Sequence, residues 1–483
     1  MRILENLQPE RVFYNFEELS RIPRCSGNEK KVSDYLVDFA KKYNLDVIQD
    51  EALNIIIKKP GTAGYENAPT VVLQGHIDMV CEKRSDVEHN FCLDPIALRV
   101  EGDYVMATGT TLGADNGIAA AMCMAILESK DIPHPPLEVL LTTSEETGMD
   151  GAIALDPKNI EGKILINIDS EEEGKALVSC AGGERDEIEI PIKWEAFDES
   201  FIPCSISFKG LKGGHSGMEI NEGRANANVL MGRVLAELNN NIEFRLVSVD
   251  GGSKTNAIPR EAKAVVVVSS KDEEKFKEVV REMENAFKNE YKSADPDLVV
   301  EIEKDKAVEK VFSNDTTDKM IAALMLIPNG VQTMSKEMEG LVESSNNLGI
   351  VTTLDDSVSF KSSIRSSVRS LKEKMANQME LIAKITGGKW NAYAAYPEWE
   401  YSPNSYIRDL FQKVYKEMTG EELEIAAIHA GLECGLFKEK FGEMDMVSFG
   451  PNMYAVHTPD EKLSISSTKR TWELLLNVLK EIK

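Results

Sequence analysis

Short apolar runs that end in polar residues recur along the first third of the chain. The run TVVLQ at residues 70–74 is continuous rather than alternating, which predicts a strand buried on both faces of a sheet. The runs LEVLLTT at 137–143 and KILINI at 163–168 have the same character. A glycine-flanked, small-residue helix is expected between the first two runs, where the sequence reads GIAAAMCMAILES. This part of the chain therefore predicts an α/β fold with a central, mostly parallel sheet.

Helical spacing of apolar residues appears at both ends of the chain. Residues 9–23 predict one helix, and a second is expected after Asn28, a residue type that favours helix N-caps. The last helix is expected over roughly residues 466–482, packed back on the first domain. These helices are expected to cover the sheet.

The pattern changes from about Pro191 onward. Strand and helix signals then follow the order βαββαβ, which predicts a ferredoxin-like unit. The stretch 316–396 resembles the same unit without its first strand, so we expect a structural repeat. The domain prediction is a catalytic domain formed by residues 1–185 and 400–483, with an inserted α+β lid of two ferredoxin-like halves at 186–399.

The three buried runs share one feature, because each of them leads into residues that can bind a metal. The first ends in His76 and Asp78, the second leads to Glu145 and Glu146, and the third leads to Asp169. Ligands of open α/β sheets bind at the carboxyl ends of the strands, so we expect these side chains in one crevice. Taken alone, the two adjacent glutamates would fit a solvated turn, but the threefold recurrence disfavours coincidence.

Asp115 is a further candidate, placed between Gly113 and Gly117 at the start of the small-residue helix. Free N–H groups at a helix N-terminus favour a carboxylate there. By itself this position fits an N-cap as well as it fits a metal ligand. Its role therefore depends on the other candidates.

The candidate residues together match a divalent metal centre. Two imidazoles, His76 and His457, and three carboxylates suit hard or borderline ions, and no thiolate is expected near them. Five ligands are too few for two closed tetrahedral sites unless one bridges, and Asp115 is the natural bridge. Two ions roughly 3.5 to 4 Å apart can lower the pKa of a shared water toward about 7, so hydrolysis is the expected chemistry. Glu145 would then be the general base, while Glu146 binds metal.

Net charge and cysteine content limit the binding partners and the cellular compartment that we expect. The 483 residues carry a net charge of −26, which argues against nucleic acid or an anionic membrane as partner. The seven cysteines are scattered, odd in number and without a CxxC pair, which favours a reduced, cytoplasmic protein. No signal peptide pattern and no apolar run approaching the roughly 20 residues of a membrane span is present.

Five motifs in order resemble those of the dizinc exopeptidases related to aminoacylase and carboxypeptidase. They are HID at 76–78, GADNG at 113–117, SEETG at 144–148, NIDSEE at 167–172 and VHTPDE at 456–461. The motifs GGHSGMEI, SSNNLG and IHAGLECG are similar to those of the aminoacylhistidine dipeptidases, also called cytosol non-specific or Xaa-His dipeptidases. The resemblance spans nearly the whole chain.

The resemblance implies a role for each matching residue. His76 and Asp169 would bind one zinc, Glu146 and His457 the other, with Asp115 bridging, Asp78 behind His76 and Glu145 as base. In the lid, the positions that match substrate-contacting ones are His215, Asn256, Arg365 and Gly431. Some relatives carry a second acidic residue where this chain has Asn116, and the peptide bond before that position is typically cis in the family.

The leading hypothesis is therefore a metal-dependent hydrolase of dipeptides with free termini, including Xaa-His dipeptides. It would hold two zinc ions per chain, with manganese or cobalt as substitutes, and could form a homodimer through the lid. A related amidohydrolase, such as an N-acyl amino acid deacylase, is the main alternative. An inactive binding protein is disfavoured because every ligand position holds a competent residue, and a nuclease is disfavoured by the negative charge.

Overall fold

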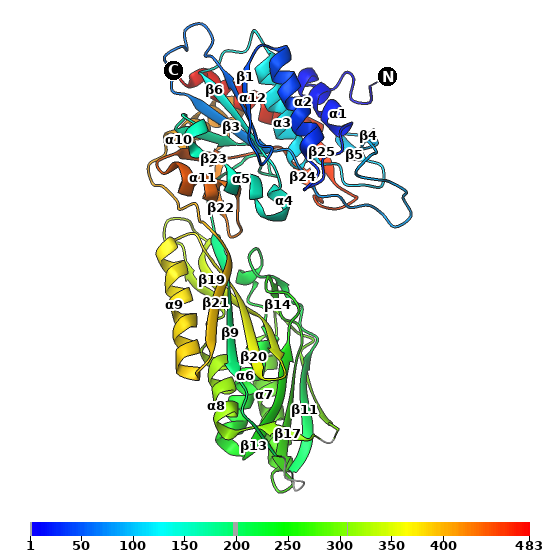
Figure 1. The fold of residues 1–483 in the computed structure, drawn as a ribbon, viewed down its shortest axis with the longest axis vertical. Helices are drawn as coiled ribbons and strands as arrows, with labels where there is room; N and C mark the ends of the chain where they lie inside the picture. Colours follow the sequence, from blue (N-terminus) through cyan, green and yellow to red (C-terminus); the bar gives the residue numbers. More distant parts are fainter. Residues whose placement is uncertain (1, 197–200, 307) are drawn as a thin grey trace. The chain divides into compact units, whose positions relative to one another are not determined.

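The computed structural model describes residues 2–196, 201–306 and 308–483 (Figure 1). The chain divides into two compact units. Unit 1 contains residues 1–179, 401–427 and 432–483, and unit 2 contains 180–400 and 428–431. The expected boundaries were 185/186 and 399/400, and the sequence pattern gave no sign that 428–431 belongs with unit 2.

Unit 1 is built on an eight-stranded sheet. Its strand order is β1 (Asp46–Gln49), β2 (Ile55–Lys59), β6 (Leu137–Thr142), β3 (Val71–His76), β7 (Ile164–Asn167), β23 (Asp445–Ser448), β8 (Lys175–Cys180) and β22 (Glu424–Ile428). The central strands β6, β3, β7 and β23 run parallel, and all residues of β3, β6 and β7 are buried. Antiparallel pairing joins β1, β2 and β6, and also joins β23 to β8. The prediction of a mostly parallel sheet is thus confirmed at the centre, while an antiparallel pair forms one edge.

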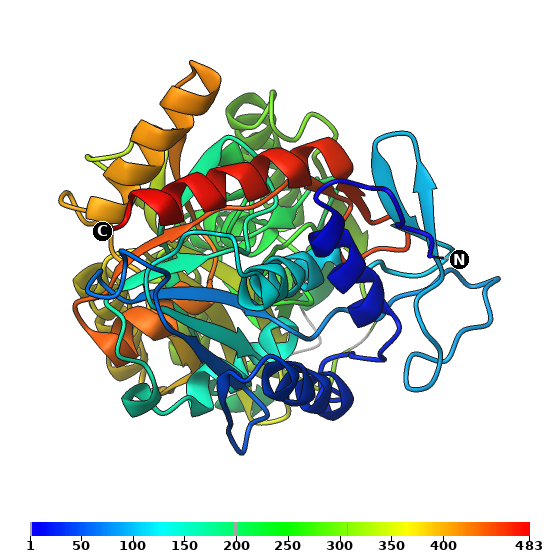
Figure 2. The same ribbon diagram turned by 90° about the horizontal axis from the view of Figure 1, so that it is seen from above.

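Helices and a small second sheet complete unit 1. The helices are α1 (Glu10–Ser20), α2 (Lys30–Lys42), α3 (Ala114–Glu128), α4 (Glu145–Gly148), α5 (Asp150–Ala154), α10 (Tyr406–Thr419), α11 (Glu433–Phe441) and α12 (Ile465–Glu481). The four-stranded sheet has the order β24 (Met453–Tyr454), β25 (Lys462–Ser464), β5 (Tyr104–Ala107), β4 (Leu98–Glu101). Helix α12, red in Figure 2, packs beside α10, and its buried face joins the core of unit 1 as predicted. Helix α2 is flanked by Glu29 and has no side-chain cap, so the prediction of Asn28 as its N-cap is wrong.

Small residues let helix α3 approach strand β3 closely. A Cβ atom at Gly75 would lie 2.3 Å from the Asn116 side-chain oxygen and 2.7 Å from the Ala119 Cβ, so only glycine fits there. The first turn of α3 is irregular at Asp115 and Asn116, and the peptide bond between them is cis. The close packing brings the start of α3 next to the end of β3, where His76 lies.

Unit 2 contains the two predicted ferredoxin-like halves on one continuous sheet. The first half is β11 (Phe201–Lys209), α6 (Ala227–Asn241), β13 (Phe244–Gly251), β15 (Ala262–Ser269), α7 (Glu273–Glu290) and β16 (Val299–Lys304). The second contains α8 (Asn314–Leu326), β19 (Val342–Thr353), β20 (Ser357–Ser366), α9 (Arg369–Thr386) and β21 (Lys389–Tyr396). The shorter strands are β10 (Trp194–Ala196), β12 (Gly214–His215), β14 (Ala257–Ile258), β17 (Lys310–Phe312) and β18 (Gly330–Met334).

The second half does have a first strand, contrary to the prediction. Strand β9 (Gly182–Pro191) pairs with both β20 and β21, although it precedes the whole first half in the chain. The sheet order is β16-β11-β15-β13-β19-β20-β9-β21, and β13 pairs with β19 at the junction of the halves. Unit 2 therefore contains two complete ferredoxin-like halves. The first strand of the second half, β9, precedes the whole first half in the chain.

The described residues include no helix long and apolar enough to cross a membrane.

The buried carboxyl of Asp186 on β9 gives the fold a testable pH dependence. Trp390 Nε1 donates to Asp186 Oδ1 at 2.5 Å, while Oδ2 is buried and finds no hydrogen-bond partner among the described residues. Burial raises the pKa of Asp186 to about 7. An unfolded aspartate releases its proton near pH ~3.9. As the pH rises between these values, the unfolded chain is deprotonated first, so the free energy of unfolding falls.

We expect Asp186→Asn to flatten this dependence, because asparagine keeps an acceptor for Trp390 but does not titrate. Between about pH 5 and about pH 7.5, the free energy of unfolding should fall by roughly 1 to 3 kcal/mol less in the variant than in the wild type. Urea unfolding of both proteins at both pH values measures this difference. Parallel pH profiles would contradict the assignment.

Candidate metal and catalytic site

The predicted ligands gather at one edge of the sheet in unit 1. Strands β6, β3 and β7 are parallel neighbours, so their carboxyl ends lie side by side. His76 is the last residue of β3, Glu145 and Glu146 open helix α4 after β6, and Asp169 follows β7. The structure thus brings together the residues that the sequence placed at three strand exits.

His76 lies among three carboxylates. Its Nε2 atom is 3.1 Å from Asp115 Oδ1 and 3.5 Å from Asp169 Oδ1, and its Nδ1 atom is 3.3 Å from Asp78 Oδ1. One ring nitrogen therefore faces the centre, while the other faces Asp78. This is the arrangement of a metal-binding imidazole that a carboxylate orients from behind.

His457 faces the same centre from the opposite end of the sequence. Its Nε2 atom lies 3.1 Å from Asp115 Oδ2 and 3.0 Å from Glu146 Oε2. The two oxygens of Asp115 therefore point toward different imidazoles. One potential ligand atom each from His76, Asp115 and Glu146 lies within 4.8 Å of the others.

The crowding of carboxylates shifts the protonation of the cluster. Hydrogen bonds to Asp115 and Glu146 raise the pKa of His457 to about 11. Burial would lower the pKa of His76, but the surrounding Asp169, Asp115 and Asp78 outweigh it and raise that pKa well above its usual value. Burial raises the pKa of Asp169 to about 6, although His76 opposes this shift. The carboxylates around both imidazoles therefore favour positive charge in this cluster.

A divalent cation fits this donor set. Imidazole nitrogens and carboxylate oxygens are ligands of borderline metals, and a bound cation would supply positive charge to this acidic cluster. Among the residues that the structure describes, Asp169 Oδ1 is buried without a hydrogen-bond partner, as expected of a ligand atom. The residues present therefore suit a metal centre.

Asp78 holds the turn that presents the two glutamates. Its carboxylate accepts hydrogen bonds from the Glu145 N–H at 3.1 Å, the Glu146 N–H at 3.3 Å and the Ser26 hydroxyl at 2.7 Å. The same carboxylate faces His76, so one buried group orients an imidazole and a turn. The sequence indicated only the contact between Asp78 and His76.

The segment between helices α1 and α2 supports the site in ways that the sequence did not indicate. Glu29 Oε1 accepts from the N–H of Ser144 at 3.1 Å and from its hydroxyl at 3.0 Å. Ser144 precedes the two glutamates and has a φ of 52°, a left-handed conformation uncommon for serine. Glu29 therefore stabilises the turn from which Glu145 and Glu146 project.

Cys25 and Cys81 form a disulfide across 56 residues of sequence. The bond joins this same segment to the chain that follows Asp78. The expectation of reduced cysteines does not hold for this pair, because spacing in the sequence does not reveal such long-range pairing.

Glu145 has the environment of a proton carrier. Burial raises its pKa well above the usual value, and the nearby negative charges of Asp169 and Glu433 add to the shift against the opposing effect of His76. A carboxyl with a raised pKa can accept a proton and release it near neutral pH. Its neighbour Glu146 instead faces His457.

A buried polar network lies just inside the strand ends. Gln74 Nε2 donates to Glu433 Oε2 at 2.6 Å, the Thr142 hydroxyl donates to the same oxygen at 2.9 Å, and Asn167 Nδ2 donates to Gln74 Oε1 at 2.5 Å. Burial raises the pKa of Glu433 to about 8. Gln74, Thr142 and Asn167 are polar residues within the three apolar runs, and this was the sequence signal that could have indicated the network.

The predicted substrate-contacting residues lie in unit 2. His215 pairs with Ala257 between β12 and β14, directly after Asn256, and Gly431 ends the segment 428–431. A Cβ atom at Gly217 would lie 3.0 Å from His215 Cε1 and 3.2 Å from Arg365 Nε, so these two side chains meet around one glycine. Tyr396 accepts a hydrogen bond from Arg365 Nη1 at 2.9 Å. The Arg365 Nε atom is buried and has no hydrogen-bond partner in the described part of the chain.

His429 joins this second cluster, although sequence reasoning did not single it out. Its carbonyl oxygen would lie 2.7 Å from a Cβ atom at Gly217, and its Nε2 atom is 2.7 Å from the Ser345 hydroxyl. Burial, reinforced by Arg365, lowers the pKa of His429 to about 3, so the ring stays neutral. Its place in the motif IHAGLECG was the signal that could have identified it.

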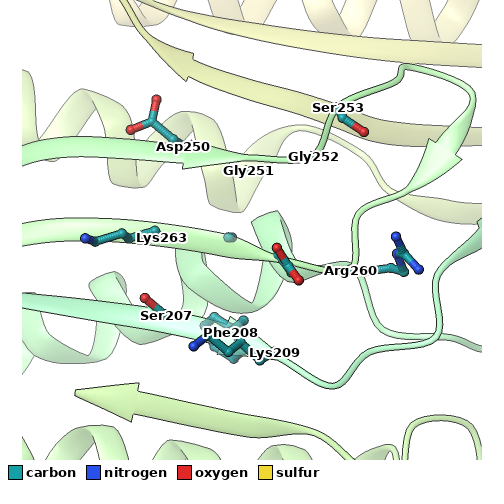
Figure 3. A pocket seen from close by; sticks show the side chains of 11 residues that line it. Ser207, Phe208, Lys209, Asp250, Gly251, Gly252, Ser253, Arg260 and Lys263 are labelled. Carbon is teal, nitrogen blue, oxygen red and sulfur yellow. The ribbon is translucent and has the colours of Figure 1, made fainter. Parts of the chain in front are cut away.

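A shallow hollow of about 520 Å³ lies elsewhere on unit 2, along β11, β13 and β15 (Figure 3). None of the predicted site residues lines it. Its lysines are paired already, Lys209 with Glu301 at 2.6 Å and Lys263 with Asp305 at 3.3 Å. The hollow is therefore separate from the predicted site residues.

Comparisons with known proteins agree with this geometry. Residues 206–295 match the family model described as a peptidase dimerisation domain. The chain is 41% identical to the cytosol non-specific dipeptidase of Escherichia coli over 485 residues, which covers 100% of this chain and 99% of that protein.

The solved structures give the same result. The aminoacylhistidine dipeptidase of Vibrio alginolyticus superposes with a TM-score of 0.96 at 41% identity, covering 99% of this chain and 98% of that one. The aminopeptidase PepT of Bacillus cereus reaches a TM-score of 0.57 at 16% identity, covering 99% of both chains, and shares the fold.

Proposed function

Because the chain belongs to the family of the cytosol non-specific dipeptidases, we propose that it hydrolyses dipeptides at a centre of two divalent ions, with zinc as the native metal. The protein is a metal-dependent hydrolase of peptide bonds. The observation that carries the two-ion proposal is Asp115, whose two carboxylate oxygens each face a different imidazole at 3.1 Å.

The donor residues divide naturally into two sets around that carboxylate. His76 and Asp169 would hold one ion, Glu146 and His457 the other, and Asp115 would contact both. Bound divalent ions supply a lowered pKa for water and a polarised peptide carbonyl. Zinc, manganese and cobalt all accept such nitrogen and oxygen ligands.

Two carboxylates of the chain have roles besides binding metal. Glu145 takes the proton of the attacking water and delivers it to the leaving amine, which its raised pKa allows. Asp78 fixes the orientation of the His76 ring and the turn that carries Glu145. The rate therefore depends on both groups through different steps.

We assign substrate binding to His215, Asn256, Arg365 and Gly431. The guanidinium of Arg365 suits the free carboxylate of a dipeptide, because its buried Nε–H has no partner within the described chain.

His215 suits a developing oxyanion. Its Nδ1 atom accepts hydrogen bonds from the N–H groups of Gly217 at 3.3 Å and Met218 at 3.1 Å, so the neutral ring carries its proton on Nε2. Burial and Arg365 lower the pKa of His215, which favours this neutral donor.

The main alternative is an N-acyl amino acid deacylase on the same fold. The full-length similarity to the dipeptidase of Escherichia coli favours dipeptides. A panel of dipeptides, including Xaa-His dipeptides, measured beside N-acetyl and N-succinyl amino acids decides between the two. Faster turnover of the acylated amino acids would reverse the assignment.

We further propose a homodimer formed through unit 2 in the cytoplasm. The matched dimerisation domain lies within that unit, and the Escherichia coli relative is named for the cytosol. The net charge of −26 remains an argument against nucleic acid and anionic membranes as partners.

Removal of metal should abolish dipeptide hydrolysis. After exhaustive chelation, turnover should fall to background, and added zinc, manganese or cobalt should restore it, because the bound ions are expected to activate the water and polarise the peptide carbonyl. The measurement is the initial rate of dipeptide cleavage at defined free metal concentrations, with magnesium as a control ion. Undiminished turnover by metal-free protein would rule out the mechanism.

The two adjacent glutamates should separate by role. Glu145→Gln should keep its metal but lose roughly 10² to 10⁴ in kcat, the usual effect of a lost acid–base group. Glu146→Gln should instead lose an ion. Metal analysis and kinetics on both variants test this, and each variant serves as the other's control. The reverse pattern would exchange the two assignments.

Loss of the lid histidine should affect turnover more than binding. We expect His215→Ala to keep its metal content and lose roughly 10² to 10³ in kcat with a small change in KM, because an oxyanion donor acts in the transition state. His89→Ala, which changes a histidine of unit 1 outside the cluster, provides the control. If His215→Ala raised KM alone, the histidine would be a ground-state contact instead.

A further inference from the structure

Glu461 connects two of the proposed ligand segments. It follows His457 by four residues in the motif VHTPDE and is only 2% exposed. Its carboxylate accepts hydrogen bonds from four consecutive backbone N–H groups, those of Leu112 at 2.7 Å, Gly113 at 3.0 Å, Ala114 at 2.8 Å and Asp115 at 3.4 Å. A side chain from the His457 segment thus binds the loop that presents Asp115.

Elementary electrostatics explains the position of this carboxylate. The first N–H groups of a helix have no partner within the helix, and a negative charge is favoured beside them. Hydrogen bonds from N–H groups to a carboxylate are stronger than those to neutral acceptors. Glu461 satisfies these groups at the start of α3, where the helix is irregular at Asp115.

Arg24 holds the same loop from its carbonyl side. Its fully buried guanidinium donates to the carbonyls of Ile77 and Asp78, each at 3.0 Å, and to that of Gly113. A Cβ atom at Gly113 would lie 2.6 Å from Arg24 Nη2, so only glycine leaves room for the guanidinium. The loop before Asp115 is therefore fixed by a buried cation on one side and a buried anion on the other.

We propose that Glu461 is a positioning residue that sets the distance between Asp115 and His457, and thereby the affinity of the ion that these two ligands share. The inference rests on the proposed two-ion site. Only three residues separate His457 from Glu461, so the hydrogen bonds of Glu461 restrain both ligands at once. A simple helix cap would stabilise α3 without changing the affinity of one ion relative to the other.

Glu461→Gln tests the proposal, and Glu138→Gln provides a matched control. Glu138 is also a 2% exposed carboxylate of unit 1 that accepts from backbone N–H groups, those of Glu161 and Gly162, each at 2.9 Å. It also pairs with Lys58 at 2.8 Å and lies near the start of β6, at the opposite end of that strand from Glu145 and Glu146. Both variants lose a buried carboxylate that binds backbone, but only one of them touches the proposed ligands.

The measurement is zinc and cobalt binding by the metal-free proteins, titrated against a competing chelator. We expect Glu461→Gln to bind the ion assigned to Asp115, Glu146 and His457 roughly 10 to 100 times more weakly than the wild type, the usual effect of losing a group that orients a ligand. The other ion should weaken less, because His457 does not hold it. Glu138→Gln should bind both ions normally. Hydrogen exchange of the metal-free protein should show faster exchange at the amides of residues 112–115 in Glu461→Gln alone.

Other outcomes would overturn the proposal. Two tight ions in Glu461→Gln, or equal weakening in Glu138→Gln, would make Glu461 a structural cap only. If Glu461→Gln does not fold, Glu461→Asp replaces it, and unchanged affinity for both ions in that variant refutes the proposal. A wild-type protein that binds fewer than two ions would instead refute the two-ion site on which the inference rests.

Discussion

The concentration of carboxylates at the ends of three parallel strands is the constraint on which unit 1 depends. Parallel pairing places the ends of β6, β3 and β7 side by side, and the residues that follow are acidic or imidazole. Such charges repel unless cations separate them. The pKa of His457, raised to about 11 by its carboxylate neighbours, shows how strongly the cluster favours positive charge. A bound divalent cation, as proposed, would offset this repulsion.

The surrounding chain is arranged to hold these charges in place. Asp78 binds the N–H groups of the glutamate turn, Glu29 binds Ser144, and Glu461 binds the loop before Asp115. Each is a buried carboxylate that accepts from backbone donors rather than binding the proposed metal. Arg24 adds the one buried cation of the described chain that contacts both the end of β3 and the Asp115 loop. Acidic residues thus form the candidate site and also hold the backbone around it.

The sequence predicted what depends on local pattern. Continuous apolar runs identified β3, β6 and β7, and the polar residues at their ends identified His76, Glu146 and Asp169, because a strand and its exit are contiguous in the chain. The roles of these residues, and of His215 and Arg365 in unit 2, stay predictions.

Long-range pairing was not predictable in the same way. Strand β9 completes the second half of unit 2 although its partner β20 lies some 170 residues away, and hydrophobic periodicity does not specify partners. The Cys25–Cys81 bond and the contacts of Glu29 and Glu461 also join residues that are far apart in the sequence. A contact between one side chain and a distant backbone group needs only a single residue. It therefore produces no periodic pattern that could be recognised in the sequence.

The central claim is that Asp115 joins two ions, and a count of bound metal tests it most directly. Native mass spectrometry of the protein, stripped of metal and then titrated with zinc, should show a species with two ions per chain at saturation, and Asp115→Asn should lower that number. Saturation of the wild type at a single ion per chain would contradict the account.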